Sequence, residues 1–147
     1  MTLAALALLV AVSPGPAAAR PHPTPTATPT PLPLEDPAIS KIALGQFLAW
    51  QIGKVDRRRY TDAVDAMMTP DTIAAAARDL VSLGALQRVV WEGPSVAQGV
   101  PAGSKAYLYL VICSDGQVYM QFFIGPDGKL ASIVFRKTLS EIGTSSE

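Results

Sequence analysis

Residues 106–136 read AYLYLVICSDGQVYMQFFIGPDGKLASIVFR, and this stretch decides the fold. Two turn signals divide it into three apolar runs of strand length. Asp115-Gly116 is a favoured two-residue hairpin turn, and Gly125-Pro126-Asp127-Gly128 fits a type I turn with glycine at the left-handed position. The stretch therefore predicts an antiparallel meander with strands over 106–113, 118–124 and 130–136. Another strand is predicted over 86–91, before a loop over 93–104.

The same two turns predict a register for the sheet. A two-residue loop at the first turn places Leu110 opposite Gln121, and a three-residue loop at the second places Gln121 opposite Ile133. One face then carries alternate residues of the three strands: Leu108, Leu110, Ile112, Tyr119, Gln121, Phe123, Ile133 and Phe135. Both faces are largely apolar, and three short helices cover only one of them. The uncovered face predicts an interface, for which a sheet-to-sheet homodimer is the simplest arrangement.

Upstream of the meander, the apolar residues recur with a helical period. Asp36-Pro37 and Thr69-Pro70 each pair a capping residue with a proline suited to the first helical position. A shorter helical pattern lies between them, over 60–68. The buried stripe predicted for the first helix contains Ile39, Ile42, Ala43, Phe47 and Trp50, widened by Leu44, Leu48 and Ile52. The fold class predicted is α+β, with N-terminal helices packed on one face of a curved antiparallel meander.

The sequence before this domain has the character of an export signal followed by a spacer. An apolar run from Leu3 to Val12 precedes Ala17-Ala18-Ala19, which predicts a signal peptide over 1–19. Residues 20–36 are rich in proline and threonine and predict a disordered linker. The domain is expected over 37–140 and a disordered tail over 141–147. We expect an exported protein, periplasmic or extracellular, without a membrane span once the signal is removed.

Composition excludes several kinds of chemistry. The chain of 147 residues balances 12 Lys+Arg against 12 Asp+Glu, which disfavours nucleic-acid binding. It contains one cysteine and one histidine, and His22 falls in the predicted linker. A catalytic triad with histidine and a zinc site of cysteine and histidine ligands are therefore not available to the domain. No metal and no cofactor are expected.

The order of elements resembles the nuclear transport factor 2-like superfamily, which includes ketosteroid isomerases and polyketide cyclases. The resemblance is carried by two segments, FLAWQIGK at 47–54 and GPDGKL at 125–130, and extends over about residues 38–137. It implies a cone-like domain in which the concave sheet face and the first helix line a pocket, while the convex face dimerises. Another cystatin-like α+β meander is the alternative fold. The pocket residues implied are Phe47, Trp50, Tyr119, Gln121, Ile133 and Phe135.

The catalytic groups of the isomerase-like members have no counterpart in these strands. Those members use a carboxylate base inside the cone, whereas the three C-terminal strands hold no acid apart from Asp115 in a turn. Neither Tyr119 nor Gln121 is a useful base at neutral pH. Asp62 or Asp65, from the helical half, is the alternative base. Both fit the solvent-exposed side of a helix as well.

Three functions remain open from the sequence. The first is a secreted, non-enzymatic domain that binds a small apolar ligand or a protein partner through its sheet. The second is an isomerase or cyclase with an aspartate base, and the third is an accessory domain of a secreted hydrolase system. Arg57-Arg58-Arg59 suggests an anion site, but Asp56, Asp62 and Asp65 offset its charge. Cys113 is expected to be a small buried hydrophobe.

Overall fold

The computed structural model describes residues 34–95 and 100–140. The predicted signal peptide, most of the predicted linker and the predicted tail lie outside these residues. Within them, no helix has the length and apolar character needed to cross a membrane. The elements follow the order α1 (Pro37–Gln51), the 3-10 turn η1 (Arg57–Arg59), α2 (Asp62–Met67), α3 (Pro70–Val81), β1 (Leu86–Ser95), β2 (Lys105–Cys113), β3 (Gln117–Ile124) and β4 (Leu130–Arg136).

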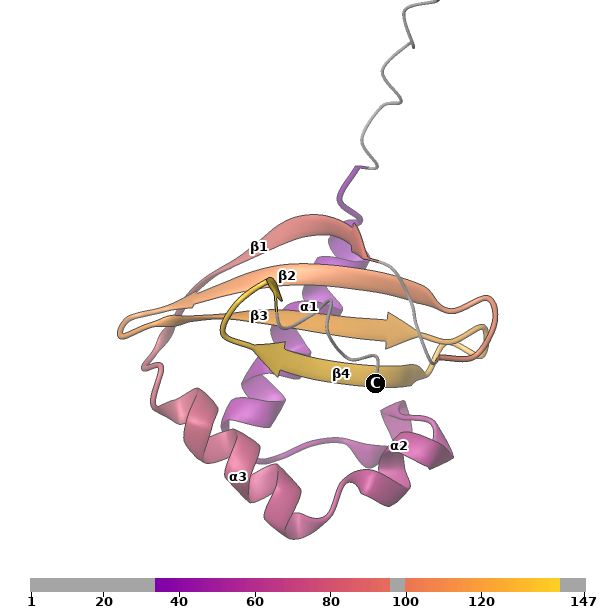
Figure 1. Ribbon diagram of the computed structural model, residues 1–147, viewed down its shortest axis with the longest axis horizontal. Helices are drawn as coiled ribbons and strands as arrows, with labels where there is room; N and C mark the ends of the chain where they lie inside the picture. Colours follow the sequence, from indigo (N-terminus) through magenta and orange to yellow (C-terminus); the bar gives the residue numbers. More distant parts are fainter. Residues whose placement is uncertain (1–33, 96–99, 141–147) are drawn as a thin grey trace, which may run out of the picture. The chain divides into compact units, whose positions relative to one another are not determined.

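The domain is α+β, with three helices packed against an open, four-stranded antiparallel sheet (Figure 1). The strands follow one another in the order β1-β2-β3-β4, so every connection joins neighbours. This confirms the predicted fold class and the meander. β1 is longer than expected, because the strand continues through Gly93 and Pro94 to Ser95 with a register shift between Trp91 and Gly93.

The predicted helix starts are confirmed by their hydrogen bonds. The Asp36 carboxylate accepts from the backbone N–H of Ala38 at 2.9 Å, and Pro37 occupies the first turn of α1. At α3 the Thr69 hydroxyl accepts from the N–H of Thr72 at 3.1 Å. These bonds satisfy donors that a helix start leaves without an internal partner.

The buried stripe of α1 is narrower than predicted. Ala43, Phe47 and Trp50 are buried, and Gln46 joins them at helical spacing. Leu44 and Leu48 are each 41% exposed and Ile52 is 63% exposed, so these residues do not widen the stripe as expected. A single sheet face below a helix covers one side of it, which leaves the flanking leucines in solvent.

The predicted register between β2 and β3 is wrong by two residues. Leu110 lies opposite Tyr119 and Ile112 opposite Gln117, while the Cys113 N–H donates to the Gly116 carbonyl at 2.8 Å. The reason lies in the preceding connection. The N–H groups of Ser114 and Asp115 donate to carbonyls of the α3–β1 connection, each at 2.9 Å, and so are unavailable to the hairpin. Since a shift of two keeps side chains on the same face, the predicted face of β2 and β3 is retained.

The predicted register between β3 and β4 is wrong by one residue over most of the strand. The turn itself is confirmed, with Ile124 opposite Leu130 and Gly128 at φ 77°. A bulge then places Ile133 opposite Phe122 and Phe135 opposite Met120, so both side chains lie on the face opposite to that predicted. The bulge has a packing cause. Leu130, Ile133 and Phe135 all pack into the helix-covered core, and strict alternation cannot bring residues three apart to one face.

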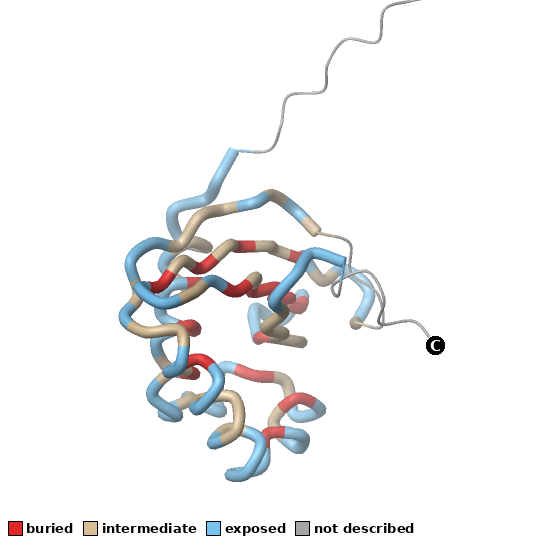
Figure 2. The backbone as a smooth tube through the Cα atoms, turned by 60° about the vertical axis from the view of Figure 1, so that its left-hand side comes forward, coloured by how far each residue is buried: buried red, intermediate tan, exposed pale blue. Residues whose placement is uncertain are grey.

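The two faces of the sheet differ in what covers them. On the helix-covered face, Phe122 is fully buried and its ring stacks on that of Tyr109 with 5.8 Å between centroids. On the helix-free face, Leu108, Leu110 and Ile112 are half-buried. Figure 2 shows buried positions along the sheet and on the helices, with exposed backbone on outer helix turns. The hydrophobic core therefore lies between the helices and one side of the sheet.

Candidate functional site

The six predicted pocket residues are divided between the two faces of the sheet. Phe47, Trp50, Ile133 and Phe135 belong to the layer between helices and sheet. The Phe135 ring lies edge-on to both aromatic rings of α1, 6.4 Å from Phe47 and 6.0 Å from Trp50 between centroids. Tyr119 and Gln121 lie on the helix-free face, because they alternate along β3 with residues that pack into the helix-covered core. The structure thus brings four of the predicted residues together and separates two from them.

A groove lies where this layer reaches the β4 edge of the sheet. Its volume is about 430 Å³, within the range of small-molecule sites. The apolar part of the lining comes from α1, α3 and its connection to β1, the start of β3, and β4: Trp50, Ala76, Leu80, Leu83, Val118, Ile133, Val134 and Phe135. Three of the predicted pocket residues, Trp50, Ile133 and Phe135, therefore line it, whereas Phe47 does not.

The polar part of the lining comes from both walls of the groove. Thr72 and Asp79 belong to α3, and Gln117, Arg136 and Lys137 to the strands and the residue after β4. Asp79 is exposed, and Arg136 is half-buried. The groove therefore combines an apolar wall with a charged rim of both signs.

A buried chain of hydrogen bonds lies directly behind the groove. The Trp50 indole N–H donates to the Tyr60 hydroxyl at 2.7 Å, and that hydroxyl donates to the Gln46 side-chain carbonyl. Tyr60 is 1% exposed, and burial raises its pKa to about 12, so the phenol stays neutral over the physiological range. Because Trp50 lines the groove, this chain holds one of its aromatic walls in place.

Sequence reasoning missed Gln46 as a buried residue. Its position in the sequence indicated burial, because Gln46 lies three residues after Ala43 and four before Trp50, on the predicted buried stripe of α1. A polar residue on a buried stripe needs a partner inside the fold. Tyr60 supplies it from the segment that leads into α2.

The helix-free face buries a second amide. Gln121 is 7% exposed, and its side-chain N–H donates to the Ser95 hydroxyl at 2.7 Å. Ser95 lies opposite Ala106, and Ala106 lies opposite Phe123. The small Ala106 side chain leaves room for the amide to reach across β2. Gln121 is thus part of a packed surface and does not line the groove.

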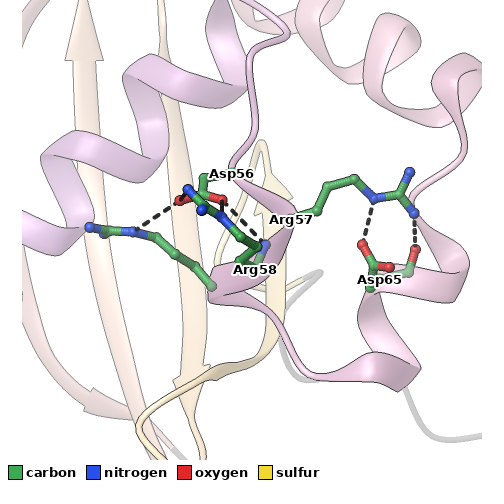
Figure 3. A network of polar contacts seen from close by, with 5 residues as sticks. Asp56, Arg57, Arg58 and Asp65 are labelled. Atoms are coloured by element: carbon green, nitrogen blue, oxygen red, sulfur yellow. Dashed lines mark hydrogen bonds and ion pairs between the residues drawn. The ribbon is translucent and has the colours of Figure 1, made fainter.

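The aspartates considered as bases are placed away from the groove. Asp65 pairs with Arg57, whose guanidinium also donates to the Asp65 carbonyl at 2.7 Å (Figure 3). Asp62 is exposed on α2. Neither residue lines the groove. Asp62 and Asp65, the alternative bases, are therefore not placed to act on a ligand held in the groove.

The arginine run is neutralised by its neighbours. Arg58 and Arg59 both approach the Asp56 carboxylate, with N–O distances of 3.1 and 3.9 Å (Figure 3). The hydrogen bond from Arg58 lowers the pKa of Asp56. Together with the Arg57–Asp65 pair, these contacts engage all three guanidinium groups on an exposed turn. The run offers no concentrated positive charge to an anionic partner.

Cys113 is buried, and burial raises the pKa of its thiol, which disfavours the nucleophilic thiolate form. Over residues 34–95 and 100–140, no three of the histidine, cysteine, aspartate and glutamate side chains are placed to hold a metal ion.

Comparison of the chain with protein-family models, curated proteins and solved structures finds no match. The resemblance to the nuclear transport factor 2-like superfamily therefore stays a prediction that rests on the order of elements and the two short segments.

Proposed function

We propose that this domain is a non-catalytic binding domain that takes a small apolar ligand in the groove between α3 and β4. One observation carries the proposal. The groove of about 430 Å³ is lined on its inner side by Trp50, Leu80 and Phe135 and opens at a rim that bears charge. An apolar ligand that enters it removes both its own surface and the groove wall from water.

The polar groups near the groove support binding in preference to catalysis. Among the described residues, the buried amides of Gln46 and Gln121 do not titrate, and the buried phenol of Tyr60 keeps its proton because burial raises its pKa to about 12. Asp79 is the carboxylate on the lining, and it is exposed. A base that removes a proton from a bound carbon acid usually lies enclosed beside an apolar wall. An isomerase or cyclase activity has less support in this arrangement.

The proposal includes export and a homodimer. The apolar run at 3–12 and the small residues at 17–19 support secretion of the domain. The half-buried Leu108, Leu110 and Ile112 on the helix-free face support pairing of two copies through that face. Light scattering of the purified protein over a hundredfold concentration range tests the dimer, which predicts twice the chain mass.

A neutral fluorescent probe tests ligand binding directly. N-phenyl-1-naphthylamine is apolar and uncharged, and its emission rises when it leaves water. We expect saturable binding to the protein and quenching of tryptophan emission by energy transfer. In Ala76→Phe the new ring fills the groove from α3, so we expect affinity to fall by about tenfold or more.

The matched control is Ala74→Phe, on the same helix. Ala74 is exposed and does not line the groove. We expect its probe affinity to equal that of the unchanged protein. Equal loss in both variants, or no loss in Ala76→Phe, would place the probe elsewhere and overturn the proposal.

A further inference from the structure

The wall that β4 gives to the groove is the edge of a strand. Five consecutive residues, 133–137, line the groove. Successive side chains of a strand point to opposite faces, so side chains alone cannot place neighbours such as Ile133 and Val134 on one wall. The backbone edge between them must also face the groove.

This edge has a strand neighbour on one side only within the described residues. β4 ends the sheet order, and β3 is its partner. At the first position of the strand, Tyr60 forms a parallel bridge with Leu130, and the Thr61 N–H donates to the Leu130 carbonyl at 3.0 Å. The edge therefore already accepts a backbone partner at its beginning. From Ala131 to Arg136, no other described strand lies beside it. An unpaired edge of this kind is a template for a further strand.

The opposite wall suits the side chains of such a strand. α3 presents Thr72, Ala76 and Leu80 along the groove, and Leu83 follows from the connection to β1. Thr72 and Ala76 are small, which leaves depth for an incoming side chain. A chain laid along β4 would direct every second side chain into this space and the others to the helix-free side.

Charge at the end of β4 specifies the second set of side chains. Arg136 lies opposite Tyr119, so its side chain is on the helix-free side of the strand. It is half-buried and belongs to none of the ion pairs among the described residues. The residue of a neighbouring strand opposite Arg136 would share its face, and a carboxylate there would pair with the guanidinium.

We propose that the groove binds an extended peptide as a fifth strand on β4, with apolar side chains at alternate positions and an acidic residue beside Arg136. This inference rests on the proposed function, since it assigns the apolar ligand of that groove to peptide side chains. Backbone hydrogen bonds to β4 supply the orientation, and the groove supplies selection for apolar residues.

A synthetic peptide tests this inference. The probe is a capped seven-residue peptide in which valine alternates with glutamate, titrated by calorimetry. The first control consists of two peptides that carry N-methyl groups on every second amide. One is methylated at the odd positions and the other at the even positions. Each keeps all side chains but removes strand hydrogen bonds. We expect one of the two peptides to bind at least about tenfold more weakly.

Charge exchange provides the second measurement. Replacing glutamate by lysine in the peptide should weaken binding to the unchanged protein and strengthen binding to Arg136→Glu. If Arg136→Glu does not fold, the comparison of the glutamate and lysine peptides on the unchanged protein still tests the charge pairing. Amide hydrogen exchange at residues 133–136 should also slow when the alternating peptide is bound.

The outcomes separate this inference from the proposed function. Binding of N-phenyl-1-naphthylamine that is sensitive to Ala76→Phe, together with no peptide binding, would overturn the fifth strand and leave the apolar groove standing. Equal affinity of methylated and unmethylated peptides would overturn it as well. If Ala76→Phe bound both N-phenyl-1-naphthylamine and the peptide as tightly as the unchanged protein, the proposed function would be overturned. A concentration-dependent dimer that protects the β4 amides would assign the edge to a second copy and overturn the peptide.

Discussion

The two sides of the sheet each bury one amide, but they surround it differently. On the helix-covered side, Gln46 is tied to Tyr60, which is tied in turn to Trp50. On the helix-free side, Gln121 bonds to Ser95, which is itself half-buried. Gln46 is 4% exposed and lies on α1 in the helix-covered layer, whereas Gln121 is 7% exposed on a face that no helix covers. Because the Gln46 chain is enclosed and the partner of Gln121 is half-buried, we expect the first contact to contribute more to stability than the second.

The same contrast holds for apolar residues. Phe122 is fully buried and stacks on two tyrosine rings, Tyr107 and Tyr109. Leu110, one sheet face away, is half-buried. The free energy gained when apolar surface leaves water scales with the area buried. The helix-covered face should therefore supply most of the free energy of folding.

Truncation on each face gives the largest expected difference. Phe122→Ala removes a fully buried ring and should lower the free energy of unfolding by about 3–5 kcal/mol. At protein concentrations low enough to leave the chain monomeric, Leu110→Ala removes a half-buried side chain and should cost about 1 kcal/mol. Urea unfolding followed by circular dichroism measures both. Equal costs would show that the helix-free face is covered in solution, as the proposed homodimer requires, and dilution would then lower the cost of Leu110→Ala.

Alkaline pH should weaken the covered side through Tyr60. Burial raises the pKa of this phenol to about 12 in the folded protein, against about 10 in the unfolded chain. The unfolded state therefore loses its proton first, and the stability contribution is complete below pH 10 and falls as pH rises toward 12. The expected loss is up to about 3 kcal/mol across that window.

Tyr60→Phe isolates this effect. Burial also raises the pKa values of Tyr107 and Tyr109. Both tyrosines are present in the unchanged protein and in the variant, so their effect on the pH dependence of stability cancels in the comparison. The variant should be less stable at pH 7 by about 1–3 kcal/mol, because Gln46 and Trp50 lose their common partner. Its stability should then fall less steeply above pH 10. Parallel pH profiles for the two proteins would contradict a buried, neutral phenol.

Most of the fold could be predicted from local signals. The capping residues Asp36 and Thr69, the turn at 125–128 and the change of period from helix to strand act over a few residues, and the structure confirms them. The predicted Asp115-Gly116 turn is wrong, because Gly116 pairs with Cys113 and the two-residue loop is Ser114-Asp115. The register could not be predicted from turn rules alone. It depends on contacts with distant segments, since the α3–β1 connection takes the N–H groups of Ser114 and Asp115.

The predicted site failed for two reasons: the helices cover the face of β3 that does not carry Tyr119 and Gln121, and β4 changes face at one residue. Ala131 is the extra residue of the β4 bulge, and it moves Ile133 and Phe135 to the face opposite Tyr119 and Gln121. The spacing of Leu130, Ile133 and Phe135 carried a signal of this bulge, because three core residues at intervals of three and two cannot share a face of a regular strand. The aromatic wall formed by Trp50 and Phe135 was predictable, since each lies on a strongly apolar stripe.

Removal of the Gln121 amide gives the smallest effect and tests the helix-free side most closely. In Gln121→Leu the Ser95 hydroxyl loses its partner, but Ser95 is half-buried and water can replace the amide. We expect a cost of about 1 kcal/mol, less than that of Tyr60→Phe. A double-mutant cycle with Ser95→Ala should give a coupling of about 0.5–1 kcal/mol. A coupling of 3 kcal/mol or more, on the order expected for a fully enclosed network, would mean that this face is as dry as the helix-covered one. The amides on the two sides of the sheet would then be equally shielded from water.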